Sequence, residues 1–466
     1  MRIMPDHARS SDPAVQAQLD RFAQLSPGRD ILGLERITAL LSLLGDPHRR
    51  LPPVFHVAGT NGKGSTCAFL RAILEAAGQS VHVYTSPHLV RFNERIRIAG
   101  TLIDDATLAP LLAEVLDAAE AHAIGPSFFE ATTAAAFLAF SRTPADACVI
   151  EVGLGGRLDA TNVVTPVVCG IAQVGIDHQA FLGDTLAEIA GEKAGIAKPG
   201  VPLVCLAQEP AALVAIERVC AEAGAPLLLE GRDWELDNSL KPGLAGAHQI
   251  RNANLAAHML MQGLSPLGDC PSPPPGDSPQ VGTVPLIPHA IIRRGIATAT
   301  WPGRLQRLPD GALTQGREIW IDGAHNATAA QALAEELARQ PMHVVIGILT
   351  NKDADGIIAP LARHALSLTF VAVPDHHSND PAVLARQWGG RNAATLEAAL
   401  LDSPSGLPGG AGGGLLSSAS AIAANKEEPP PAPPRSREGE QEGPTLIAGS
   451  LYLCGEALRL NGTLPD

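Results

Sequence analysis

Lys63 follows a glycine-rich turn whose composition is typical of a phosphate-binding loop. The stretch 57–66 has the sequence V-A-G-T-N-G-K-G-S-T, after an apolar run at 54–58 that predicts a strand and before a helical pattern at 67–77. Backbone N–H groups and the positive end of the helix dipole attract an anion in such a turn, and the lysine adds a mobile cation. The loop departs from the pattern G-x-x-x-x-G-K-[ST], because position 57 is valine and Gly64 follows the lysine. We interpret it as a nucleotide-phosphate site rather than a chance glycine turn. The predicted phosphate-binding residues are Gly59, Thr60, Asn61, Gly62, Lys63, Gly64 and Ser65.

Three polar residues at predicted strand ends suit a divalent cation. Ser86 and Glu151 end or follow apolar runs, and His178 comes shortly after another. The runs concerned are 80–84, 147–152 and 167–174. Ligands collect beyond the carboxyl ends of parallel strands, and a carboxylate with an imidazole beside a triphosphate suits Mg2+ that keeps water and phosphate ligands. Each residue alone also has an ordinary explanation, as a capping serine, a solvated glutamate or a hydrogen-bonded histidine.

Lys193 lies on the apolar face of a predicted helix. The helix spans 185–197 and begins with a possible capping box between Thr185 and Glu188. The face that carries the lysine contains Leu186, Ile189, Ala190, Lys193 and Ala197. A lysine that extends along its methylenes to solvent is one interpretation. The other is a lysine that turns into the site and is modified so that it loses its positive charge.

A second group of polar residues occurs in the turn I-D-G-A-H-N, which follows the predicted strand 318–322. Asn326 suits a helix N-cap, while Asp322 and His325 are candidates for contact with a nucleotide. Arg304 is a candidate cation for phosphates, although the pattern alone fits an ordinary surface arginine better. His88 and the D-H-H stretch at 375–377 have no assigned role.

The order of the apolar segments predicts an α/β protein of two domains. Buried strands alternate with helices, which indicates largely parallel sheets covered by helices. We expect a P-loop NTPase-like first domain at 1–300, with a mainly parallel sheet, and a smaller Rossmann-like α/β domain at 301–466. Two segments interrupt the pattern. The Pro-rich one at 265–288 has little helical or strand signal and is treated as an insertion, and the Gly-, Pro- and charge-rich one at 403–444 has a composition that predicts a disordered insertion.

Composition excludes several classes of protein. Lys and Arg number 34 against 48 Asp and Glu, a net charge of −14 that argues against binding to nucleic acid or to an anionic membrane. The seven cysteines contain no C-x-x-C pair, so neither a disulfide framework nor a zinc site is expected. The N-terminal residues lack the apolar core of a signal peptide, and no apolar run suits a membrane span. We expect a cytoplasmic protein.

The motifs together resemble the folylpolyglutamate synthase/dihydrofolate synthase branch of the Mur ligase superfamily. They occur in family order over nearly the whole chain apart from the two insertions. The matching stretches are I-L-G-L-E-R-I (31–37), the loop at 57–66, Y-T-S-P-H-L (84–89), F-F-E-A-T-T-A-A-A-F (128–137), E-V-G-L-G-G-R-L-D-A-T-N (151–162), D-H-x-x-x-L-G (177–183), E-K-A-G-I (192–196), P-G-R-L-Q (302–306), D-G-A-H-N (322–326) and G-S-L-Y (449–452).

The resemblance implies an ATP- and Mg2+-dependent ligase that joins L-glutamate to dihydropteroate or to reduced folates through an acyl phosphate. By motif, Ser86, Glu151 and His178 would hold Mg2+, and Lys193 would match a carbamylated lysine. The implied ATP contacts beyond the loop are Asn252, Arg304, Asp322 and His325, and the implied pteroate contacts are Ser127, Phe129 and Leu158. Lys63, Glu151, His178 and Lys193 form the implied catalytic group. A monomer without nucleic-acid or membrane partners is expected.

Two alternatives stay open at the level of sequence. A cell-wall Mur ligase would share the chemistry, but it carries an extra N-terminal domain of ~100 residues, more than the 56 that precede Val57 here. A protein that binds ATP without ligase activity would share the loop. Within the family, F-F-E-A-T-T at 128–133 is compatible with a dihydropteroate pocket, so we favour a bifunctional enzyme.

Overall fold

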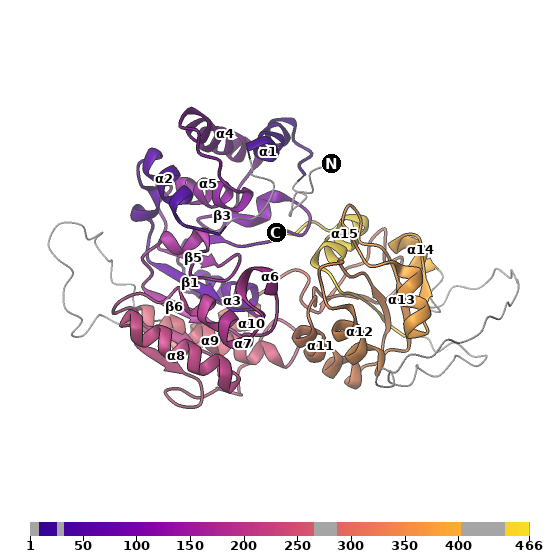
Figure 1. The fold of residues 1–466 in the computed structure, drawn as a ribbon. Coiled ribbons are helices and arrows are strands. Elements are labelled where there is room, and N and C mark those ends of the chain that lie inside the picture. Colours follow the sequence, from indigo (N-terminus) through magenta and orange to yellow (C-terminus); the bar gives the residue numbers. More distant parts are fainter. Residues whose placement is uncertain (1–8, 26–31, 265–286, 402–442, 466) are drawn as a thin grey trace, which may run out of the picture. The chain divides into compact units, whose positions relative to one another are not determined.

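The computed structural model describes residues 9–25, 32–264, 287–401 and 443–465. The chain divides into two compact units, one formed by Met1–Arg304 with Leu464–Asp466 and the other by Leu305–Thr463. Most of the two predicted insertions, 265–288 and 403–444, lies outside the described residues, so the expected disorder of 403–444 stays a prediction. Figure 1 shows both units as sheets covered by helices.

The first unit is built on an eight-stranded sheet in the order β4-β3-β2-β5-β1-β6-β7-β8. The strands are β1 (Val54–Ala58), β2 (Val81–Tyr84), β3 (Ile96–Ile98), β4 (Thr101–Leu102), β5 (Ala147–Glu151), β6 (Val168–Ile171), β7 (Leu203–Cys205) and β8 (Leu227–Leu229). All neighbours pair in parallel except β2 with β3 and β3 with β4. The strand β1 is central, and its neighbours β5 and β6 place their carboxyl ends beside the loop that follows it.

Helices cover both faces of this sheet. They are α1 (Pro13–Leu25), α2 (Glu35–Leu43), α3 (Lys63–Ala76), α4 (Asp105–Ala121), α5 (Phe128–Arg142), α6 (Gln179–Leu182), α7 (Leu186–Ala194), α8 (Pro210–Ala223), α9 (His248–Leu264) and α10 (His289–Thr298). Alternate residues of β1 enter different cores, because successive side chains of a strand point to opposite faces. Phe55 and Val57 pack with residues of α3, α9 and α10, whereas Val54 packs with residues of α1, α2, α4 and α5, which lie together in Figure 1.

The second unit contains a six-stranded sheet in the order β13-β12-β11-β14-β10-β9. Its strands are β9 (Gln306–Arg307), β10 (Ile319–Ile321), β11 (His343–Ile346), β12 (Ser367–Phe370), β13 (Arg391–Asn392) and β14 (Thr445–Ala448). Its helices are α11 (Ala327–Arg339), α12 (Ala354–Ala362), α13 (Pro381–Trp388), α14 (Leu396–Leu401) and α15 (Leu451–Asn461). Only the edge strand β9 is antiparallel to its neighbour.

The predicted fold class is confirmed, since both units are α/β with mainly parallel sheets. The element bounds differ in places. The helix after the phosphate loop was expected at 67–77 but begins at Lys63, because the loop residues themselves form its first turn. The expected helix at 130–140 is α5, which begins two residues earlier and is capped by Ser127.

Two further observations bear on composition. None of the helices in the described part of the chain is long and apolar enough to cross a membrane. The six cysteines that fall within the described ranges are free and buried.

Candidate active site

The phosphate loop connects β1 to α3 at the centre of the sheet. Gly59 and Gly62 adopt φ angles of +146° and +90°, which side-chain-bearing residues rarely adopt. A Cβ atom on Gly62 would lie 2.4 Å from Oδ1 of Asn252, which α9 contributes. The structure therefore brings Asn252 to the loop, and its contact with ATP stays a prediction. The first N–H groups of α3 have no partner within the helix and suit an anion.

The loop holds two lysine ammonium groups. Lys63 donates hydrogen bonds to the carbonyl oxygens of Gly59 at 3.0 Å and Thr60 at 3.3 Å. Lys193, from α7, donates to the same Gly59 oxygen at 3.1 Å. Both lysine side chains meet at one carbonyl oxygen, and the positive charge of Lys63 suits the phosphates of a nucleotide.

Lys193 is only 4% exposed, so the predicted inward orientation of its helix face is confirmed. The helix α7 starts with the predicted capping box, in which Thr185 and Glu188 bond each other's backbone N–H groups. Burial, together with the charge of Lys63, lowers the pKa of Lys193 to about 7. A substantial fraction of this amine is therefore neutral near pH 7, which is the form that reacts with CO2.

Glu151 ends β5 and lies beside the segment that follows β2. Its carboxylate is 5% exposed and accepts a hydrogen bond from the N–H of Ser86 at 3.2 Å. Burial raises the pKa of Glu151, while the positive charges of Lys63 and Arg304 oppose that shift. Arg304 thus acts electrostatically on this carboxylate. The structure brings Ser86, Glu151 and Lys63 into one neighbourhood.

His178 occupies a more open position than the other proposed metal ligands. It has a φ of 54° at the start of α6, and its side chain is 44% exposed, with Nε2 at 3.9 Å from Asp177. Among the described residues, no group of three or more His, Cys, Asp or Glu side chains could hold a metal ion. Mg2+ at a nucleotide needs few protein ligands, because phosphates and waters complete its coordination. A buried carboxylate beside a serine suits such a hard cation.

Hydrogen bonds between side chains and nearby backbone groups hold the polar turn of the second unit. Asp322 follows β10 and accepts the N–H groups of Leu305 at 2.7 Å and Ala324 at 2.8 Å. Nδ1 of His325 bonds the carbonyl of Gly323 at 2.8 Å, and Asn326 caps α11, as its position predicted. Contact of Asp322 and His325 with a nucleotide stays a prediction.

The proposed pteroate residues lie around the start of α5 and the loop after β5. Ser127 caps α5 in a reciprocal arrangement with Glu130, so its hydroxyl has a structural task. The ring of Phe129 packs against Tyr84, with centroids 5.9 Å apart, and covers Gly153, whose added Cβ would lie 2.4 Å from that ring. Leu158 is half-buried in the same loop.

A buried series of hydrogen-bonded polar residues, which was not predicted from the sequence, lies beneath that loop. Asp159 accepts the N–H of Leu154 at 2.8 Å and the hydroxyl of Thr161 at 2.5 Å. Nε2 of His56 lies 2.9 Å from the same hydroxyl, so it carries the proton and donates it. Two signals were present in the sequence: a polar residue inside the apolar run 54–58, and Asp159 and Thr161 in the stretch 151–162. These hydrogen bonds fix the loop after β5 against the central strand β1.

The chain is similar in sequence and in fold to known ligases. Residues 303–402 match the model of the Mur ligase glutamate ligase domain. The chain is 31% identical over 461 residues to dihydrofolate synthetase of Saccharomyces cerevisiae, covering 93% of this chain and 98% of the relative. The solved structure of E. coli FolC in complex with DHPP and ADP superposes with a TM-score of 0.77 at 28% identity, covering 97% and 98% of the two chains. The bifunctional folylpolyglutamate synthase/dihydrofolate synthase of Yersinia pestis, complexed with AMPPNP and Mn ion, superposes with a TM-score of 0.76 at 26% identity, covering 97% and 99%.

A phosphate loop at the centre of a parallel sheet, with two inward lysines and a buried carboxylate, defines an ATP-dependent ligase of the Mur type. More narrowly, the chain belongs to the folylpolyglutamate synthase/dihydrofolate synthase family of that superfamily. It catalyses ATP-dependent ligation of glutamate to pteroate or folate substrates.

Proposed function

We propose that the enzyme acts on both dihydropteroate and reduced folates, with ATP and Mg2+ at the phosphate loop. The observation that carries the nucleotide site is the meeting of Lys63 and Lys193 at the Gly59 carbonyl. The relatives' structures support the proposed choice of ligands, since one holds DHPP with ADP and another holds AMPPNP with Mn ion.

The reaction has two steps. A carboxylate oxygen of the pteroate or folate attacks the γ-phosphorus of ATP, the bond to the β-phosphate oxygen breaks, and ADP leaves. The amine of L-glutamate then attacks the acyl carbon, inorganic phosphate leaves, and the amine loses a proton as the amide forms. Neither step needs a covalent enzyme nucleophile, so the enzyme's task is positioning and charge stabilisation.

The residues take distinct roles in this proposal. The first N–H groups of α3 and the ammonium of Lys63 bind the phosphates. Asn252 and Arg304 help to position the nucleotide. Bound Mg2+ would neutralise phosphate charge, with Ser86, Glu151 and His178 as its protein ligands. Lys193 would serve as a carbamate, an anion that suits the metal or its waters. Phe129, with Ser127 and Leu158, lines the pteroate site.

The experiment supplies dihydropteroate, then a reduced folate, each with ATP, Mg2+ and L-glutamate, and follows the products by mass. Bifunctional activity predicts a gain of one glutamyl residue on both substrates, with one ADP per amide. Product from one substrate alone would contradict the bifunctional proposal. The first step alone forms one ADP per acyl phosphate, so sustained ADP release without glutamate would contradict the coupling of ATP cleavage to amide formation. We also propose a cytoplasmic monomer, which sedimentation at assay concentration and fractionation of cells would test.

A further inference from the structure

The phosphate loop is joined to the segment that follows β6. The N–H groups of Thr60 and Asn61 donate to the carbonyl of Gln173 at 2.8 and 3.1 Å. The hydroxyl of Thr60 donates to the carbonyl of Gly175 and accepts the N–H of the same residue, both at 3.0 Å. The direction of the loop therefore depends on where residues 173–175 lie.

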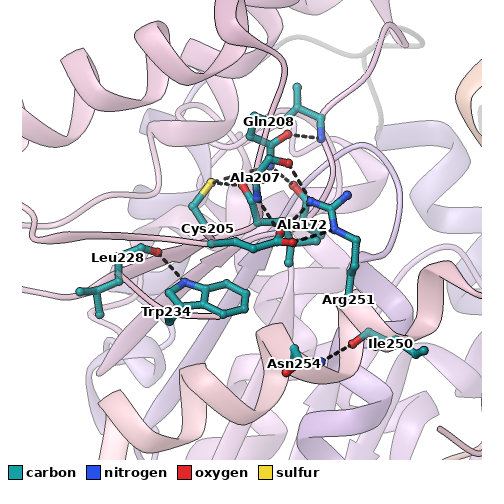
Figure 2. A network of polar contacts seen from close by, with 12 residues as sticks. Ala172, Cys205, Ala207, Gln208, Leu228, Trp234, Ile250, Arg251 and Asn254 are labelled. Atoms are coloured by element: carbon teal, nitrogen blue, oxygen red, sulfur yellow. Dashed lines mark hydrogen bonds and ion pairs between the residues drawn. The ribbon is translucent and has the colours of Figure 1, made fainter. Parts of the chain in front are cut away.

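Gln208 holds that segment from the other side. Its amide nitrogen donates to the carbonyl of Ala172 at 2.9 Å, and its amide oxygen accepts the N–H of Val174 at 2.9 Å. Figure 2 shows this side chain beside Ala172 and Cys205. The backbone ladder of β6 and β7 ends where the N–H of Leu206 donates to Ile171. The Gln208 side chain continues the ladder by one step, since its amide supplies the donor and acceptor that a strand would supply.

An ion pair fixes the residue before Gln208. Arg251 donates to the carbonyl of Ala207 at 2.9 Å and to the carboxylate of Glu230 at 2.7 Å. Glu230 in turn accepts the N–H of Ala207 at 2.7 Å, so both polar groups of that backbone unit are held. Arg251 also precedes Asn252, whose side chain lies against Gly62. The same part of α9 thus acts on the phosphate loop in two ways: Asn252 contacts it directly, and Arg251 acts through Ala207 and Gln208.

We propose that Gln208 is a positioning residue for the phosphate loop, with the pair of Arg251 and Glu230 as its support. The inference rests on the proposed nucleotide site. Without the amide, the carbonyl of Ala172 and the N–H of Val174 lose their partners, and the segment that orients Thr60 and Asn61 is released. The first N–H groups of α3 then lie out of place for the phosphates. A displacement of about 1 Å in such a site costs on the order of 100-fold in rate.

The test compares Gln208→Ala with the wild type in the full chain, with KM for ATP and for the folate substrate measured separately. We expect KM for ATP to rise by about 10-fold or more, while KM for the folate substrate changes less than about twofold. The affinity for AMPPNP in the presence of Mg2+, measured by calorimetry, should weaken by the same factor. A KM for ATP within twofold of the wild-type value would overturn the proposal.

Gln208→Glu provides a second readout. It keeps an acceptor for Val174 but places a carboxylate oxygen against the carbonyl of Ala172, so it should bind AMPPNP at least as weakly as Gln208→Ala at neutral pH. Protonation restores a donor, and the affinity relative to wild type should recover as pH falls toward 5. An affinity ratio that does not change with pH would contradict the role of the donated hydrogen bond. Arg251→Lys is a milder change and should raise KM for ATP by a smaller factor than Gln208→Ala does.

Asn461 offers a matched control in the second unit. It is also buried, accepts the N–H groups of Leu313 and Thr314 at 3.2 Å, and donates to the carbonyl of Pro309 at 3.0 Å. Asn461→Ala should lower thermal stability without a selective rise in KM for ATP. An equal rise in both variants would show a general loss of stability and overturn the positioning role. Failure of the wild type to bind AMPPNP would instead contradict the proposed nucleotide site.

Discussion

The ammonium group of Lys193 donates a hydrogen bond to the carbonyl oxygen of Gly59 at 3.1 Å, joining α7 to the phosphate loop across 134 positions of sequence. Both partners are held inside the protein, and Lys63 bonds the same oxygen. Two neighbouring ammonium groups repel each other, and burial penalises charge, so the more buried one is the easier to neutralise. The neutral amine is the form to which CO2 adds, and we propose that Lys193 is carbamylated.

The first prediction concerns the carbamate of Lys193. Lys193→Ala should lose activity by on the order of 100-fold or more, because an anion that orients the metal or its waters is missing. Bicarbonate or short carboxylates should restore part of the rate by occupying the vacated site. Lys193→Arg keeps a positive charge but cannot form the carbamate, so it should be as poor as the alanine variant. Turnover measured with and without added bicarbonate decides the matter, and an active arginine variant would show a simple cationic role.

The second prediction concerns the metal ligands. Glu151→Gln removes the charge that offsets a divalent cation, and His178→Ala removes a ring nitrogen. Each should lower turnover by on the order of 100-fold at limiting Mg2+, with part of the loss recovered at high Mg2+. Titration of turnover with Mg2+ measures this effect. Glu114→Gln, which breaks an exposed pair with Arg142, is the control and should behave as the wild type. Normal activity of either site variant at limiting Mg2+ would remove that residue from the metal site.

The third prediction tests the pteroate site. In Gly153→Ala the added Cβ would lie 2.4 Å from the ring of Phe129, so the ring must move. We expect KM for the pteroate or folate substrate to rise about 10-fold, with KM for ATP unchanged. Gly191→Ala is a suitable control, because its Cβ meets only the Arg218 side chain at 3.9 Å. Equal substrate affinity in Gly153→Ala and the wild type would place Phe129 outside the site.

The fourth prediction concerns acid stability. Burial, with a smaller effect of the charge on Lys198, lowers the pKa of His56 to about 3. Between pH 6.5 and 3 the unfolded chain takes up a proton at this residue and the native protein does not, so native stability falls as pH decreases through that window. His56→Gln removes this dependence while retaining an amide donor for Thr161. Relative to wild type, the variant should gain unfolding free energy as pH falls, by at most about 5 kcal/mol. Urea unfolding at pH 7 and pH 4.5 measures the difference, and a pH-independent difference would contradict a neutral buried His56.

The fifth prediction concerns the segment 403–444, whose composition predicts disorder. Such a sequence buries too little apolar surface to offset an ordering entropy of ~1–2 kcal/mol per residue. Replacing most of it with a short Gly/Ser linker between α14 and β14 should leave Tm and activity close to the wild-type values. A large decrease in Tm would show that the segment packs against the protein.

The sequence by itself determined the local features of this enzyme. The spacing of apolar residues predicted the α/β class and placed Lys193 on an inward helix face, where the structure has it. The capping box at Thr185 and the cap at Asn326 were also predicted, because caps depend on residues within three or four positions of each other. The glycines of the phosphate loop were recognisable because positive φ angles favour glycine.

The tertiary structure alone decided which distant residues meet. The strand order β5-β1-β6 places Glu151 near the phosphate loop and brings Thr161 under His56. The end of the β6–β7 ladder gives Gln208 its place beside Ala172, although nothing in its local sequence distinguishes it from a surface glutamine. These contacts join residues tens of positions apart, and no local periodicity reports them. They follow from sheet order and register, which long-range packing determines.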